Sequence, residues 1–191
     1  MNHVMYAVRS GFTLVELLVV AGITAFLAGM LLVYGSSGRE QTTLYVEQAK
    51  IVQIIARAKS LAVSTLNRTS APCGYGVAFH YGSSTYELFR YDIDGDCKDI
   101  LDPTGFGITS QGGDPTIRYE RLEGFVLPAE VVFESGNNSL VYAFFMPPDP
   151  STGVFTSAGT PPVPTASVVL KGRKGVDSLV VTVTRAGQIS F

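Results

Sequence analysis

Glu16 is a carboxylate in a place where it needs a cationic partner. It is the only charged residue in the 23-residue run from Phe12 to Tyr34. An ionisable group inside an apolar helix costs about 2.5 to 3.5 kcal/mol on insertion scales. Two interpretations follow, a carboxylate paired with a positive group at membrane level and one that is solvated or locally paired at the membrane edge.

The two cysteines, Cys73 and Cys97, are the next candidates for covalent chemistry. An even number of cysteines in a domain beyond the membrane suggests one disulfide. Closing a loop of about 25 residues contributes roughly 3 to 4 kcal/mol in the chain-entropy model. A pair of buried free thiols is the alternative.

An acidic stretch offers a weak calcium candidate, because Asp92, Asp94 and Asp96 alternate as hard oxygen ligands do in calcium loops. The EF-hand pattern requires glycine at its sixth position and glutamate at its twelfth. Here Gly95 is fourth and Pro103 stands at the twelfth position. A solvated acidic turn is therefore the main interpretation, and no other metal site is expected.

Enzyme chemistry is not indicated. Beyond the first residues the only histidine is His80, and the chain has no nucleophile motif, phosphate loop or metal-ligand spacing. We expect no enzymatic activity and no cofactor. With a formal net charge of -2, the protein also lacks the overall basicity of a nucleic-acid-binding domain.

One basic cluster remains, formed by Lys171, Arg173 and Lys174 together with Arg185. A solvated hairpin turn explains it without any ligand. Contact with DNA or another extracellular ligand is the alternative.

The run from Phe12 to Tyr34 is long enough to cross a membrane, because 23 residues of helix rise about 34 Å and a bilayer core is about 30 Å thick. The chain is 46% hydrophobic and only 16% charged, below the roughly 25% charged that is typical of soluble domains. A secretory signal would have a shorter apolar region and a small-x-small cleavage site. We therefore expect a retained transmembrane helix over residues 12–34.

A second helical segment is predicted within residues 35–72, an amphipathic helix followed by a linker. Apolar residues recur at helical spacing from Leu44 to Ala62, and Ile51, Ile55, Ala58 and Ala62 are expected to pack on the domain's own sheet. The segment is either continuous with the first helix or hinged at Gly35 to Gly38. Pro72 should terminate it.

The remainder, residues 73–191, has the texture of antiparallel strands. Glycines near Gly82 and from Gly172 to Gly175 are expected to supply positive φ in hairpin turns. Residues 147 to 164 contain six prolines and are expected to form an exposed loop. The fold class is α+β, with a long helix packed by its C-terminal half on an antiparallel sheet. The expected strands are 77–81, 85–91, 124–127, 131–133, 140–146, 167–170 and 179–184.

The stretch Arg9-Ser10-Gly11-Phe12-Thr13-Leu14-Val15-Glu16 resembles the leader junction of the type IV pilin and type II secretion pseudopilin superfamily. In that family a short basic leader ends in glycine, a hydrophobic residue follows, and glutamate is fifth in the mature chain. The resemblance implies removal of residues 1–11 by a prepilin peptidase, N-methylation of Phe12, and pairing of Glu16 with the N-terminal amine of a neighbouring subunit.

The layout of anchor helix, short helix and β-rich domain is similar to the FimT and H-type minor pseudopilin branch. It implies a minor subunit that acts in initiation or at the tip of a pilus or secretion pseudopilus. Its partners would be other pilin subunits, the prepilin peptidase, the inner-membrane assembly platform and the bilayer. Its location would be the cytoplasmic membrane, single-pass with the N-terminus inside, and then a fibre. A DNA- or ligand-binding pilin and an unprocessed single-span anchor are the alternatives.

Overall fold

The computed structural model describes residues 13–65, 72–93, 117–147, 152–156, 162–175 and 177–191. The chain divides into two compact units. The N-terminal unit is Met1–Arg39 and the C-terminal unit is Glu40–Phe191.

One helix, α1 (Leu14–Ser64), contributes residues to both units. It includes Gly35 and Gly38, so the helix continues through the glycines and does not end at them. Two glycines weaken a helix by about 1 kcal/mol each relative to alanine without forbidding it. The segment that was predicted as a second helix is therefore the second half of α1.

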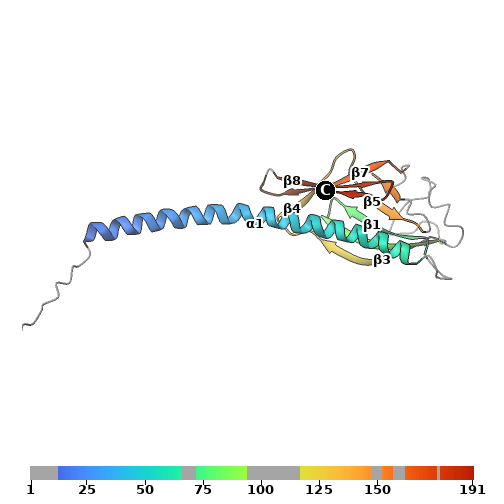
Figure 1. The fold of residues 1–191 in the computed structure, drawn as a ribbon, viewed down its shortest axis with the longest axis horizontal. Helices are drawn as coiled ribbons and strands as arrows, with labels where there is room; N and C mark the ends of the chain where they lie inside the picture. Colours follow the sequence, from blue (N-terminus) through green and yellow to red (C-terminus); the bar gives the residue numbers. More distant parts are fainter. Residues whose placement is uncertain (1–12, 66–71, 94–116, 148–151, 157–161, 176) are drawn as a thin grey trace, which may run out of the picture. The chain divides into compact units, whose positions relative to one another are not determined.

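The strands that the structure describes in the C-terminal unit form two sheets, whereas the sequence predicted one (Figure 1). Sheet A has the order β3-β2-β1-β5-β6 and sheet B the order β4-β7-β8-β9. All strand pairs within them are antiparallel. Sheet A consists of β1 (Gly74–His80), β2 (Thr85–Ile93), β3 (Ile117–Val126), β5 (Tyr142–Phe145) and β6 (Thr152–Phe155). Sheet B consists of β4 (Val131–Glu134), β7 (Thr165–Gly172), β8 (Ser178–Thr184) and β9 (Ile189–Ser190).

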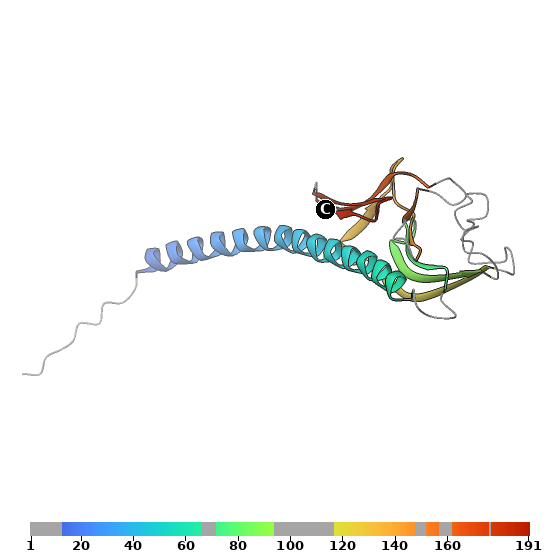
Figure 2. The ribbon, with the colours of Figure 1, turned by 45° about the vertical axis from the view of Figure 1, so that its right-hand side comes forward.

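The main core lies where α1 and the two sheets meet. Ile51, Ile55, Ala58 and Ala62 are buried there, which confirms the predicted apolar stripe. They share one cluster with Val77 and Leu88 of sheet A and with Val168 and Val181 of sheet B. Figures 1 and 2 both show this part of α1 running alongside the sheets. Burial of these side chains is what holds the second half of α1 in place.

The other face of sheet A carries a second, aromatic cluster that includes Phe89, Tyr91 and Phe144. Glycines make room for these rings. A Cβ on Gly76 would overlap the Phe89 ring and lie 2.6 Å from the carbonyl oxygen of Ala143. The rings therefore lie directly over the backbone of β1.

The prediction of an exposed loop over residues 147–164 is wrong at residues 152–155. Strand β6 lies there, and all four residues of β6 are buried. Pairing with β5 places Gly153 opposite Phe144, and Val154 enters the main core. The six prolines of this stretch predicted a loop locally. Packing against β5 overrides that local preference.

Strand β3 begins at Ile117, earlier than the predicted 124. Its first half contains several charged residues, so no strand was predicted there. Across the sheet, Arg90 pairs with Glu120, and Arg57 of α1 pairs with Glu123 at 2.6 Å. Such cross-strand and helix-to-strand charge pairs stabilise a sheet edge that is exposed to water.

Candidate functional site

The first turn of α1 is built around Thr13. Its Oγ1 accepts a hydrogen bond from the Glu16 N–H at 3.3 Å, and its carbonyl oxygen accepts one from the Leu17 N–H at 3.2 Å. Thr13 is thus an N-cap residue, and Thr13-x-x-Glu16 has the residue types of a capping box. Thr13 was not among the residues predicted to have a role, although the T-x-x-E pattern before an apolar run indicates an N-cap.

Glu16 lies in the first turn of α1 and its side chain is exposed. A carboxylate in a helix's first turn is favoured by the helix dipole. The structure therefore gives Glu16 a local stabilising role at the helix start. Pairing with a neighbouring subunit stays a prediction.

The helix that follows Glu16 has an exposed apolar surface on every side. The window Leu14–Leu31 has a mean hydropathy of 2.3, and none of it is buried within the chain. Its large apolar side chains range from 52% exposed at Val19 to 81% exposed at Leu14. The segment is long and apolar enough to cross a membrane.

A single apolar N-terminal helix with an α+β domain after it fits a membrane-anchored, single-pass protein. Residues 7–32 match the family model of the prokaryotic N-terminal methylation motif. This match supports a type IV pilin-like protein and points to a structural subunit that interacts with other pilins and with the prepilin peptidase. No curated protein and no solved structure matched the chain significantly.

The matched stretch contains Gly11, Phe12 and Glu16. Gly11 and Phe12 lie outside the described residues. Cleavage between them and methylation of Phe12 therefore stay predictions.

The predicted basic cluster is divided by the structure. Lys171 is the last residue but one of β7 and pairs with Glu134 at 3.0 Å, while Arg173 and Lys174 are exposed in the turn that follows. Arg185 follows β8 at its far end, because Lys171 pairs with Ser178 at the start of that strand. Arg185 is therefore not part of the turn cluster.

The glycines of this turn have a role that the sequence did not indicate. Among the described residues, the positive φ values are at Ser84 and Gly187, not at Gly82, Gly172 or Gly175. Gly172 instead faces the carboxylate of Glu40, because a Cβ there would overlap Oε1 and lie 2.9 Å from Cδ. Gly172 thus leaves the space that the Glu40 carboxylate occupies.

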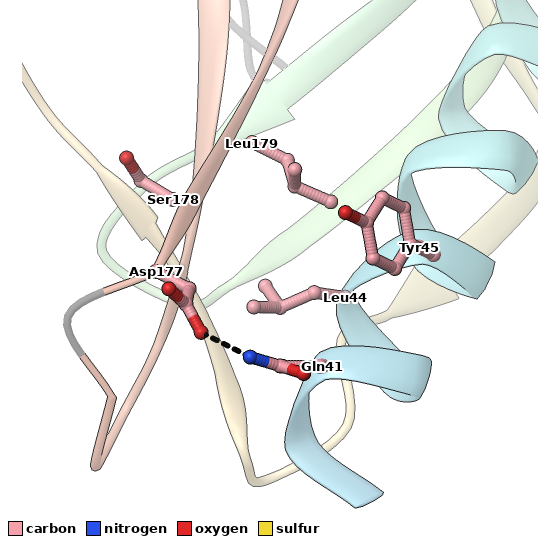
Figure 3. Close-up of a pocket in the computed structure, with 6 residues that line it drawn as sticks. All are labelled: Gln41, Leu44, Tyr45, Asp177, Ser178 and Leu179. Atoms are coloured by element: carbon pink, nitrogen blue, oxygen red, sulfur yellow. Dashed lines mark hydrogen bonds between the residues drawn. The ribbon is translucent and has the colours of Figure 1, made fainter. Parts of the chain in front are cut away.

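A small pocket adjoins this turn, shown in Figure 3. Its volume is about 240 Å³. At one side of the pocket Gln41 of α1 donates a hydrogen bond to Asp177 Oδ2 at 2.8 Å. The Leu44 side chain lies between α1 and the start of β8. Six residues line the pocket: Gln41, Leu44, Tyr45, Asp177, Ser178 and Leu179.

The structure does not place the three aspartates of the calcium candidate together. Asp92 lies in β2, and Asp94 and Asp96 lie outside the described residues. Within the described part of the chain, no group of three or more His, Cys, Asp or Glu side chains could hold a metal.

His80 lies in a strand, as predicted, and is the last residue of β1. Its Nε2 is 3.2 Å from Glu87 Oε1 on β2. Cys73 is buried in the aromatic cluster immediately before β1. Cys97 lies outside the described residues, so the disulfide stays a prediction.

Two core tyrosines have perturbed acidity. Burial, and then the negative charge of Glu47, raise the pKa of Tyr86 to about 12. Burial raises the pKa of Tyr81 to about 12 as well, against a smaller opposing effect of its hydrogen bond with Ser139. Glu47 is itself buried and pairs with Lys50 at 2.5 Å. These groups belong to the packing of the C-terminal unit.

Proposed function

We propose that the chain is a minor pilin or pseudopilin subunit of a type IV pilus or type II secretion pseudopilus. A prepilin peptidase cuts between Gly11 and Phe12, Phe12 is N-methylated, and the subunit acts in fibre initiation or at the tip. The observation that carries this proposal is the methylation motif at residues 7–32. This motif overlaps the apolar helical window Leu14–Leu31, none of which is covered by other parts of the chain.

Exposed apolar side chains on all sides of a helix require lipid or other protein chains around them. Before assembly the bilayer meets this requirement. In a fibre the same surface of neighbouring subunits replaces the lipid. The subunit has the N-terminus inside and the C-terminal unit outside the cytoplasmic membrane.

Glu16 is the residue whose loss tests this assembly. We expect Glu16→Ala to leave leader cleavage intact and to lower incorporation into fibres, because the carboxylate would no longer meet the amine of a neighbouring subunit. The measurement compares processed subunit in membranes with subunit in sheared fibres.

Thr24→Ala is the matched control. Its hydroxyl already donates to the Val20 and Ala21 carbonyl oxygens of its own helix, both at 3.0 Å, so removing it breaks no intersubunit bond. If wild type, Glu16→Ala and Thr24→Ala are incorporated into fibres equally, the proposed assembly role of Glu16 is wrong.

A DNA- or ligand-binding pilin is the second candidate, supported by the exposed Arg173 and Lys174 at the β7–β8 turn. Phosphate contacts by such side chains weaken as salt rises. If the turn binds DNA, the double variant Arg173→Ala/Lys174→Ala loses a salt-dependent affinity that Arg185→Ala retains. Equal binding by the two variants would exclude the turn as the contact.

A further inference from the structure

The β7–β8 turn binds a carboxylate from within the chain. Glu40 Oε1 accepts a hydrogen bond from the Lys174 N–H at 2.9 Å and another from the Gly175 N–H at 3.2 Å. Both residues lie in the same compact unit as Glu40. Successive backbone N–H groups that converge on one oxygen form a nest, and nests bind anions.

The shape of the turn fits this occupant. A side chain on Gly172 would overlap the carboxylate, and a Cβ on Gly175 would lie 3.6 Å from its Oε1. The Arg173 N–H is engaged elsewhere, donating to the Glu130 carbonyl oxygen at 2.7 Å. Gly172 leaves the space that the carboxylate fills, and the Arg173 hydrogen bond anchors the turn on its other side.

Two cationic side chains flank the nest. Arg173 and Lys174 extend from the turn as exposed cations. Of the acids near the turn, Glu134 pairs with Lys171 at 3.0 Å and Asp177 accepts a hydrogen bond from Gln41 at 2.8 Å, while the Glu130 side chain is exposed. A phosphate would receive the same two N–H bonds and has further oxygens for the two cations.

We propose that the β7–β8 turn is an oxyanion site of the phosphate class, which Glu40 fills as an internal competitor. The site does not depend on the assembly role of the protein. Because Glu40 is tethered, an external anion must overcome an effective concentration on the order of millimolar. By linkage, an anion that displaces Glu40 also loosens the attachment of α1 to sheet B.

The test uses the full chain in detergent micelles, labelled with ¹⁵N, and follows the amide signals of Lys174 and Gly175. Sodium phosphate is titrated at constant ionic strength into wild type, Glu40→Ala and Glu40→Gln. Glu130→Ala is the matched control, because it removes a neighbouring exposed carboxylate and leaves the nest and its occupant in place.

We expect saturable shifts in Glu40→Ala at a phosphate concentration at least about tenfold lower than in wild type, a factor that corresponds to about 1.4 kcal/mol. Glu40→Gln should fall between them, because the amide keeps an acceptor oxygen without the charge. Glu130→Ala should behave as wild type. The proposal is overturned if neither Glu40 variant responds to phosphate more strongly than Glu130→Ala.

Discussion

The first half of α1 leaves its apolar side chains exposed, whereas the second half buries an apolar stripe in the core. From Leu14 to Leu31 no part of the window is buried within the chain. From Glu40 onward, Leu44, Ile51 and Ile55 are at most 1% exposed and form part of the main core. The first half is apolar on all sides, as a membrane helix is, and the second is apolar on one stripe. One helix thus has two separate folding environments.

The two halves of α1 should therefore respond differently to substitution. Substitutions in the second half of α1 should act on the folding of the C-terminal unit. Substitutions in the first half should leave that folding unchanged and act on insertion and assembly. Each prediction below tests one side of this division, starting with the largest expected effect.

Ile55→Ala should lower the free energy of unfolding of the C-terminal unit by about 2 to 5 kcal/mol, because it leaves a cavity in a fully buried site. Leu18→Ala is the control, since Leu18 is 66% exposed in the first half. Denaturant unfolding of the full chain in micelles measures both. Equal losses in the two variants would contradict the division of α1.

The predicted disulfide between Cys73 and Cys97 should contribute roughly 3 to 4 kcal/mol to the C-terminal unit and nothing to the membrane helix. Mass spectrometry of the unreduced protein should find no thiol that alkylates. Two alkylatable cysteines would show that packing alone holds this unit together.

Gly76→Ala should cost about 1 to 3 kcal/mol, because the added methyl overlaps the Phe89 ring and the Ala143 carbonyl oxygen. Gly82→Ala is the matched control in the following turn, where a Cβ meets nothing within 4 Å. Thermal unfolding of both variants tests whether the aromatic cluster is packed as tightly as described. A Gly76→Ala protein as stable as Gly82→Ala would argue against that packing.

Alkaline pH should weaken the C-terminal unit. The pKa of Tyr86 is raised from 10.0 to about 12 by burial and then by Glu47. Between these values the unfolded chain releases the proton that the folded chain keeps, so stability is full below pH 10 and falls as pH rises toward 12. Tyr86→Phe should flatten this fall in an unfolding series, and an unchanged slope would contradict it.

Periodicity predicted the features that depend on neighbouring residues. The apolar stripe that contains Ile51 and Ile55 and the α+β class are both confirmed. Strand β6 was missed because its burial comes from pairing with β5 and not from its own pattern. The Glu40 contact joins residues 134 positions apart in the chain, and no local pattern predicts such a distance.

The first turn of α1 shows the opposite case. Thr13 and Glu16 are three residues apart, so their hydrogen bond could have been predicted from a capping-box pattern. The sequence predicted either a distant cationic partner for Glu16 or a solvated or locally paired carboxylate, and it did not predict the contact of its N–H with Thr13. Local and intersubunit roles of Glu16 are compatible, because its N–H makes the bond to Thr13 and its carboxylate is exposed.

The mature N-terminus is the most direct test of the proposal that this chain is a processed pilin subunit. The protein is expressed in a host that has a prepilin peptidase, purified from membranes, and its N-terminal peptide is analysed by tandem mass spectrometry. We expect a peptide that begins with N-methylated Phe12 and lacks residues 1–11. A mature protein that still begins at Met1 would contradict the proposal.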